Sequence, residues 1–235
     1  MKQERGNFCT PPRLSGTPPL RWEGSKRVKN MKIIGVGMNY ASHNKELNPS
    51  LIEPREPVIF TKPDSAFQDC RKPFFIPDFA GRFDYETEIV VRICRLGKHI
   101  DQRFAHRYYD SVTVGIDFTA RDLQTQLREQ GLPWDLCKGF DHSAVTGQFI
   151  SLKDIPPIQD LHFHLDIDGQ TVQTGWTGDM IFTIDRIIAY VSRFFTLKMG
   201  DLIFTGTPSG VGPVSEGMLL HGYIEAQRVL ELKIK

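Results

Sequence analysis

Closely spaced cysteines are missing from this chain of 235 residues. The four that it has are far apart and form no C-x-x-C pair: Cys9, Cys70, Cys94 and Cys137. A zinc ribbon, a thioredoxin-type redox site and a disulfide-dense secreted module all need closer spacing or more cysteines. We therefore expect a reducing compartment, the cytoplasm, and a core large enough to be stable without disulfide bonds.

Long apolar runs and a strong net charge are missing as well. No uncharged stretch approaches the roughly 18 apolar residues of a membrane-spanning helix. The richest segment, 179–195, is interrupted by Asp185, Arg186 and Arg193. The formal net charge is only +1. We therefore expect no membrane span and no nucleic-acid partner.

The first thirty residues differ in composition from the rest. They hold seven basic and two acidic residues and four prolines, without apolar periodicity. We expect residues 1–30 to be an irregular N-terminal extension and residues 31–235 to form one folded domain. A transit peptide, a nucleic-acid-binding tail and a true start of translation at Met31 are the alternative interpretations of this segment.

Hydrophobic periodicity predicts many short strands and few helices. Apolar spacing favours an amphipathic helix within 180–195, and 41–47 and 119–130 have helical character. Asp168-Gly169 predicts a hairpin turn. The segments with strand character are 32–37, 57–61, 85–93, 111–118, 161–168, 171–173, 201–205 and 229–234. This pattern is typical of a β-rich α+β fold.

Two glycine-rich segments could suggest nucleotide binding, but neither fits. Gly35-Val36-Gly37 follows an apolar segment, yet Tyr40 stands where a dinucleotide fingerprint needs its third glycine. The segment 206–212 has no Gly-Lys-Ser/Thr ending, so it is not a Walker loop, and a tight turn is the simpler interpretation.

A pair of carboxylates is more informative. Glu86 and Glu88 lie on one face of a predicted strand, about 6.5–7 Å apart along it. Carboxylates that close repel each other unless a positive charge lies between them, and a hard divalent cation is suited to that place. Asp117, in the apolar stretch 112–118, could supply a third ligand because an unpaired buried acid is costly. The alternative is a solvated strand face.

Three further groups could carry chemistry or could be ordinary surface residues. His43 and Glu46 share one side of a helical turn, where a carboxylate could orient an imidazole as a general base; the alternative is a surface contact. Lys138, between Trp134 and Phe140, could be a partly desolvated cation near an anionic substrate; the alternative is a solvated lysine. The segment 162–168 alternates His162, His164, Asp166 and Asp168 on one face, which suits either a metal site or the polar outer face of a hairpin.

Taken in order, six motifs resemble the fumarylacetoacetate hydrolase family. They are GMNYASHNKE at 37–46, FTKPDSA at 60–66, DYETE at 84–88, DFTARDLQ at 117–124, KGFD at 138–141 and GDLIFTGTPSGVG at 200–212. The resemblance covers about residues 31–235. It implies a rolled, barrel-like mixed sheet and a homodimer. It does not fix the substrate, because the family includes hydrolases, decarboxylases, isomerases and tautomerases.

The resemblance also implies roles for individual residues. Mg²⁺ or Mn²⁺ would be held by Glu86, Glu88 and Asp117, and His43 with Glu46 would activate water from a mobile lid. The residues matching positions that hold the substrate or its oxyanion are Arg121, Gln124, Lys138, Gly206 and Thr207. Departures from the family pattern at 142–147 and 176–179 leave the substrate open.

The leading hypothesis is a metal-dependent hydrolase that cleaves a carbon–carbon bond in acylpyruvate-like 2,4-dioxo acids, of the fumarylpyruvate type. The alternative is an oxaloacetate decarboxylase or tautomerase, or an enzyme like 2-hydroxyhepta-2,4-diene-1,7-dioate isomerase. These reactions share an enolate whose charge the metal and Lys138 would stabilise. A non-catalytic small-molecule binding module is the third possibility, and the presence of His43 and Glu46 speaks against it.

Overall fold

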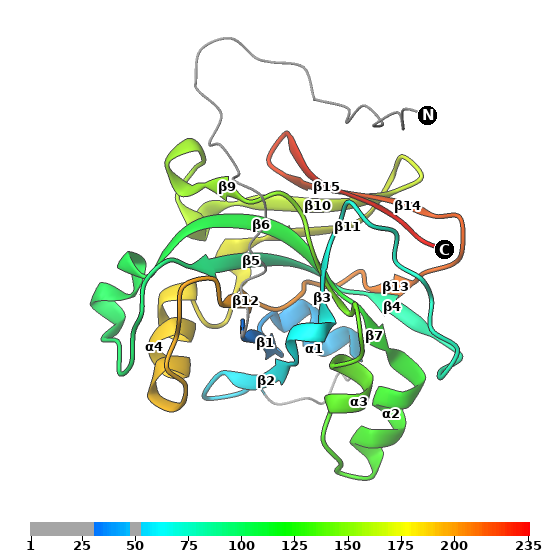
Figure 1. The fold of residues 1–235 in the computed structure, drawn as a ribbon, viewed down its shortest axis with the longest axis horizontal. Coiled ribbons are helices and arrows are strands. Elements are labelled where there is room, and N and C mark those ends of the chain that lie inside the picture. The colour runs from blue at the N-terminus through cyan, green and yellow to red at the C-terminus, as the bar shows by residue number, and fades with distance from the viewer. Residues whose placement is uncertain (1–30, 48–52) are drawn as a thin grey trace, which may run out of the picture.

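A computed structural model describes residues 31–47 and 53–235, so the expectation of an irregular extension over 1–30 concerns residues outside the described part. A curled mixed sheet of eight strands dominates the fold (Figure 1) and forms a half-barrel. Its order is β2-β1-β12-β5-β6-β8-β3, and β9 pairs with β6. The strands are β1 (Ile33–Gly37), β2 (Val58–Lys62), β3 (Phe67–Asp69), β5 (Thr87–Ile93), β6 (Tyr109–Asp117), β8 (Ala144–Thr146), β9 (Ile150–Ser151) and β12 (Leu202–Phe204). The predicted β-rich α+β fold with a rolled mixed sheet is confirmed.

Two smaller sheets complete the β structure. The four-stranded sheet has the order β11-β10-β14-β15 and lies against β5 and β6 of the main sheet (Figure 1). The three-stranded sheet has the order β13-β4-β7. These strands are β4 (Phe83–Tyr85), β7 (Thr119–Ala120), β10 (His162–Ile167), β11 (Gln170–Trp176), β13 (Gly212–Pro213), β14 (Leu219–Ile224) and β15 (Gln227–Lys233).

The helices are few and short. The α-helices are α1 (Ala41–Leu47), α2 (Arg121–Glu129), α3 (Asp135–Lys138) and α4 (Ile184–Phe194). Short 3₁₀ helices cover Asp64–Ala66, Gln102–Arg107, Leu152–Asp154, Ile158–Asp160 and Thr177–Asp179. Within the described residues, no helix combines the length and the apolar character that a membrane crossing requires.

The core lies inside the curled sheet and between the sheets. Strand β5 is rich in β-branched residues, which fit a pleated surface that is covered on both sides. Gly222 of β14 lies so close to Val114 of β6 that an added Cβ would be 2.8 Å from the valine side chain. Phe74 and Phe118 stack with ring centroids 3.8 Å apart. Tight packing of this kind holds the ends of β5 and β6 in fixed positions.

Most predicted elements are present, with two informative differences. Helix α4 begins at Ile184 rather than at Met180, because the Thr183 hydroxyl accepts a hydrogen bond from Arg186 N and caps the helix there. The predicted hairpin turn, by contrast, is present as expected: Asp168 and Gly169 both have the positive φ that this turn needs.

The second difference lies in the predicted strand 85–93. It is interrupted at Glu86, with β4 ending at Tyr85 and β5 beginning at Thr87. The two halves belong to different sheets, so the chain changes sheet at the first of the two paired carboxylates.

Candidate active site

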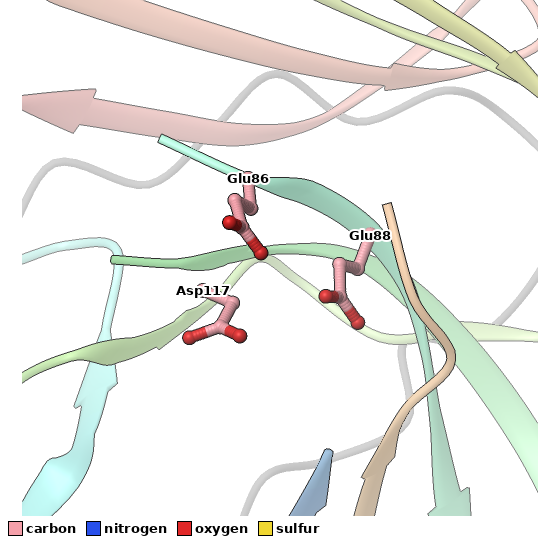
Figure 2. A group of neighbouring side chains, drawn as sticks. All are labelled: Glu86, Glu88 and Asp117. Carbon is pink, nitrogen blue, oxygen red and sulfur yellow. The ribbon is translucent and has the colours of Figure 1, made fainter. Parts of the chain in front are cut away.

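Three acidic side chains converge where β5 begins and β6 ends. Glu86 occupies the break before β5, Glu88 lies on β5, and Asp117 is the last residue of β6. Antiparallel pairing of β5 with β6 aligns Thr87 with Ile116, and Asp117 N donates to Glu86 O at 2.9 Å. One carboxylate oxygen from each of the three residues lies within 4.8 Å of the others (Figure 2). Strand register therefore brings together acids that are about thirty residues apart in the sequence.

Burial decides between the two interpretations of this strand. Glu86 is 5% exposed, Glu88 is 2% exposed and Asp117 is fully buried. The alternative of a solvated strand face is therefore wrong, because the sheet curls and this face of β5 lies inside the half-barrel. Carboxylates buried in this way need cations or hydrogen-bond donors around them.

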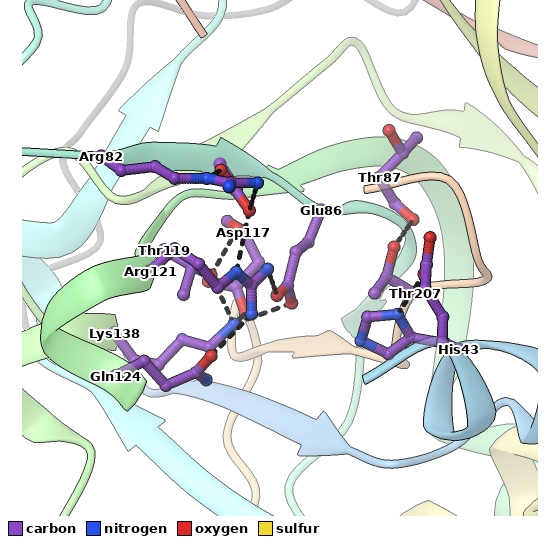
Figure 3. Close-up of polar contacts among 12 residues, drawn as sticks. His43, Arg82, Glu86, Thr87, Asp117, Thr119, Arg121, Gln124, Lys138 and Thr207 are labelled. Carbon is purple, nitrogen blue, oxygen red and sulfur yellow. Dashed lines mark hydrogen bonds and ion pairs between the residues drawn. The ribbon is translucent and has the colours of Figure 1, made fainter. Parts of the chain in front are cut away.

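Lys138, at the end of α3, supplies one of those cations. Its buried ammonium group lies 2.8 Å from Glu86 Oε2 and 2.8 Å from Asp117 Oδ2, and it donates to Thr119 Oγ1 at 2.6 Å (Figure 3). Burial alone would lower the pKa of Lys138, but Asp117 and Glu86 outweigh it and raise that pKa to about 12. The lysine is therefore a fixed positive charge beside the acids, and the interpretation as a solvated lysine is wrong.

Arg121 begins α2 and faces the same carboxylate cluster. Its guanidinium donates to Asp84 Oδ2 at 2.8 Å, to Gln124 Oε1 at 2.6 Å and to Glu86 Oε1. Burial opposes ionisation of Glu86, but the charges of Lys138 and Arg121 hold its pKa well below the ordinary value. The structure thus places Arg121, Gln124 and Lys138 on one side of the acids, as Figure 3 shows.

Glu88 has a different environment from Glu86. Among the described residues its carboxylate receives one hydrogen bond, from Gly206 N at 2.7 Å. Burial, followed by repulsion from Asp117 and Glu86, raises the pKa of Glu88 well above the ordinary value. Within the described part of the chain no lysine or arginine pairs with Glu88, unlike Glu86 and Asp117, and the donor atoms of all three acids are hard oxygens. That chemistry fits Mg²⁺ or Mn²⁺, which Glu86, Glu88 and Asp117 would hold.

The loop after β12 forms another wall of the site. Gly206 has a φ of +98°, and an added Cβ would lie 2.8 Å from Asn39 Cβ, so only glycine fits there. The resemblance implied a substrate contact for Gly206, but its N–H already binds Glu88. Thr207 is 4% exposed, and its hydroxyl donates to Thr87 O at 2.9 Å.

The histidine–glutamate pair comes from α1. His43 Nδ1 lies 3.2 Å from Glu46 Oε2, and Glu46 also accepts from Gly210 N at 3.2 Å. His43 is 6% exposed, so the interpretation of the pair as a surface contact fails for the imidazole. Figure 3 shows His43 on the Thr207 side of the site, across from Lys138.

The sequence analysis missed three residues that support this arrangement. Lys62, at the end of β2, is fully enclosed and pairs with Asp117, and it donates to Ser143 Oγ at 3.0 Å. Asp84 accepts hydrogen bonds from Arg121 and from Arg82, whose Nε lies 2.7 Å from Asp84 Oδ1. Gln173 reaches the site from β11. Lys62 and Asp84 lie inside quoted motifs, but Gln173 lies in none.

The alternating His and Asp residues of 162–168 do not form a comparable cluster. His164 Nε2 lies 3.9 Å from Asp166 Oδ1, and His162 is exposed. In the part of the chain that the structure describes, only Glu86, Glu88 and Asp117 form a group with metal-ligand geometry. The polar outer face of a hairpin is the interpretation that fits 162–168.

Comparison with known proteins agrees with this geometry. The family model "Fumarylacetoacetate (FAA) hydrolase C-terminal" matches residues 32–234. The mitochondrial oxaloacetate tautomerase FAHD1 of Mus musculus is 36% identical over 224 residues, 94% of this chain and 98% of that protein. The oxaloacetate tautomerase YcgM of Escherichia coli is 38% identical over 187 residues, 79% of this chain and 84% of that protein.

A solved structure with bound ligands is also similar. The fumarylpyruvate hydrolase of Pseudomonas aeruginosa, crystallised in complex with Mn²⁺ and pyruvate, superposes with a TM-score of 0.80. It is 33% identical, and the match covers 90% of this chain and 93% of that one.

Proposed function

Because the chain belongs to the fumarylacetoacetate hydrolase C-terminal family, we propose that it is a divalent-metal-dependent enzyme that interconverts the keto and enol forms of oxaloacetate. The observation that carries this proposal is the convergence of three buried carboxylates with the Lys138 ammonium 2.8 Å from two of them. The names of the two curated relatives, which cover most of this chain, support the substrate.

The residues of the site suit a small anionic 2-oxo acid. When bound at Glu86, Glu88 and Asp117, a divalent cation would supply Lewis-acid polarisation of the oxo group. Lys138 stabilises the negative charge that develops on the oxo oxygen as a neighbouring C–H bond breaks. Arg121 and Gln124 lie beside Lys138 and orient the substrate carboxylate.

His43 moves the proton in this proposal. Its Nδ1–H donates to Glu46, so Nε2 is left to accept a proton. In oxaloacetate the proton leaves the carbon next to the oxo group, and the oxo oxygen gains a proton to complete the enol. The carboxylate of Glu46 stabilises the imidazolium while it carries that proton.

A second function has a specific observation in its favour. The Pseudomonas aeruginosa relative, a fumarylpyruvate hydrolase, binds Mn²⁺ and pyruvate, and the His43–Glu46 pair is also suited to activating water for attack on a 2,4-dioxo acid. In that reaction water adds to the distal carbonyl, the carbon–carbon bond breaks, and pyruvate leaves as its enolate. The same Lys138 would stabilise that charge.

One set of assays tests both functions. Purified protein with Mg²⁺ or Mn²⁺ is given oxaloacetate, whose enol is followed by ultraviolet absorbance, and separately acetylpyruvate and fumarylpyruvate, whose cleavage is followed by pyruvate release. We expect faster tautomerisation than hydrolysis, and loss of both with EDTA. If the metal-supplemented protein were inactive on every substrate, the proposal would be wrong. Hydrolysis that is faster than tautomerisation would favour the second function. The homodimer expected from the resemblance stays a prediction for light scattering to test.

A further inference from the structure

One buried amide joins the carboxylate strand to the loop that carries Thr207. Gln173 extends from β11 of the four-stranded sheet and is 2% exposed. Its Oε1 accepts from Thr87 N at 3.0 Å, and its Nε2 donates to Thr207 Oγ1 at 2.7 Å and to Pro208 O at 2.8 Å. Both amide hydrogens and the amide oxygen are thus used, and these partners fix the orientation of the amide.

The position of Thr87 explains why an amide is needed there. Thr87 lies between Glu86 and Glu88, at the first residue of β5. Strand β12 pairs with β5 only from Val90 onward, and Thr205 N donates to Ile89 O at 3.1 Å just beyond that ladder. The Thr87 N–H therefore lies beyond the end of β12, and Gln173 takes the place of the missing strand partner.

The loop is held to the same strand at two further points, and Gly210 links it to β11 and α1. Thr207 accepts from Gln173 and donates to Thr87 O, so its hydroxyl hydrogen has a defined direction. Gly206 N donates to Glu88 Oε2 at 2.7 Å. Gly210 packs against Gln173, where an added Cβ would lie 3.4 Å from Cγ, and its N–H binds Glu46.

We propose that Gln173 is a positioning residue that sets the separation between the loop 206–210 and the carboxylates of Glu86 and Glu88. The inference rests on the proposed function, because that function makes this separation matter. Among the described residues, the Gln173 amide forms no hydrogen bond with a proposed metal ligand or with the His43–Glu46 pair. It acts through Thr87 and Thr207, and loss of its amide leaves the Thr87 N–H and Pro208 O to find new partners by shifting the loop.

The test is Gln173→Met, which keeps the length of the side chain and removes all three hydrogen bonds. Replacing a residue that hydrogen-bonds a metal ligand typically costs about 10–100-fold in affinity or activity, and Gln173 acts one contact further away. We expect kcat/KM on oxaloacetate to fall by about tenfold, the lower end of that range, with a raised KM, and the Mn²⁺ and pyruvate dissociation constants to rise in calorimetric titrations. The matched control is Gln170→Met, an exposed glutamine on the same strand, which should leave all of these values unchanged.

The titrations separate positioning from a purely structural role. A structural role would lower the melting temperature and the fraction of active enzyme but leave KM and both dissociation constants of the folded protein at wild-type values, and that outcome would overturn the proposal. If Gln173→Met does not fold, Gln173→Glu retains the acceptor for Thr87 N–H and loses the donations to Thr207 Oγ1 and Pro208 O, and a smaller change in the same direction is expected. Wild-type values in that variant would also overturn it.

The experiment also separates this inference from the proposed function. If the wild-type protein bound Mn²⁺ and pyruvate but converted no substrate, the proposed function would be wrong. The dissociation constants of the Gln173→Met variant would still decide the role of Gln173. A wild-type protein that binds neither would overturn both. A double variant with Thr207→Val should show a non-additive loss, because Gln173 and Thr207 share a hydrogen bond.

Discussion

Lys138 Nζ lies 2.8 Å from Glu86 Oε2, so a buried cation neutralises one of the acids proposed as metal ligands. Glu88, one residue beyond Thr87, contacts Gly206 N instead. The two glutamates of the pair are therefore not equivalent, although they look equivalent in the sequence. The difference between them makes the consequences of replacing each one distinct.

Replacing Glu88 and replacing Glu86 should have opposite effects on the metal-free protein. Glu88→Gln relieves repulsion from Asp117 and Glu86, so the melting temperature in EDTA should hold or rise. Glu86→Gln removes the charged partner of Lys138 and Arg121, and uncompensated buried charge typically costs about 3–5 kcal/mol. Both variants should weaken Mn²⁺ binding by more than about tenfold, since even the outer partners of metal ligands are worth that much.

Thermal unfolding in EDTA and calorimetric Mn²⁺ titration of the two variants provide the measurements. Asp110→Asn, a change at an exposed acid on β6, is the matched control and should alter neither quantity. Unchanged Mn²⁺ affinity in both variants would contradict the assignment of these residues as metal ligands.

The sequence predicted the strand pair that carries the acids better than it predicted their surroundings. Period-two alternation placed Glu86 and Glu88 on one face, and the apolar context of Asp117 indicated a buried acid. Alternation cannot show that the sheet curls, however, because curling depends on pairings between strands far apart in the chain. The fully enclosed Lys62 and the half-barrel interior therefore appeared only in the structure.

Supporting residues were harder to predict than the acids themselves. His43 and Glu46 are three residues apart, so helical spacing alone makes them neighbours. Gln173 and Thr87 are 86 residues apart and belong to different sheets. A glutamine on a hairpin strand carries no local signal of burial, and only the packing of β11 beside the loop 206–210 gives it three partners.

The contribution of Glu88 to the stability of the metal-free protein should fall as the pH rises. The folded-state pKa of Glu88 is raised, so between its unfolded value, about 4.3, and its folded value the native state keeps a proton that the unfolded state releases. By linkage, stability is full below the unfolded pKa and is lost as the pH rises through that interval. Comparing melting temperatures of wild type and Glu88→Gln in EDTA from pH 5 to 8 isolates this contribution. The melting temperature of Glu88→Gln should rise relative to that of wild type as the pH rises. A difference between the two melting temperatures that stays constant with pH would contradict the prediction.

Cys137, next to Lys138 on α3, should resist alkylation in the native protein. Burial raises the pKa of its thiol to about 11, and its side chain is fully enclosed. Only about one thiol in a thousand would be ionised at pH 8, and the thiolate is the nucleophile. Mass spectrometry after iodoacetamide treatment should find Cys94, which is partly exposed, modified before Cys137. Equal labelling rates would show that α3, and with it Lys138, opens readily.

His43→Ala should slow both candidate reactions, because the same imidazole accepts the proton in each. Hydrolysis needs a deprotonated water, and loss of a general base typically costs about 10²–10⁴-fold. In the proposed enolisation the same imidazole takes the proton from the carbon next to the oxo group, so oxaloacetate conversion should fall within the same range. Glu46→Gln should lie between wild type and His43→Ala, because the amide still accepts a hydrogen bond from Nδ1 but no longer stabilises an imidazolium.

The two reactions are measured side by side on the same preparations, with Lys45→Ala, an exposed neighbour on α1, as the control that should leave both rates unchanged. Comparable losses in both reactions are expected, and they could arise because a base is lost or because a substrate contact is lost. The pH profile decides between these two: a base shows a limb that His43→Ala abolishes, whereas a binding residue raises KM and leaves the limb in place. Unchanged rates in both reactions would remove His43 from the mechanism, even though the structure places it beside Thr207.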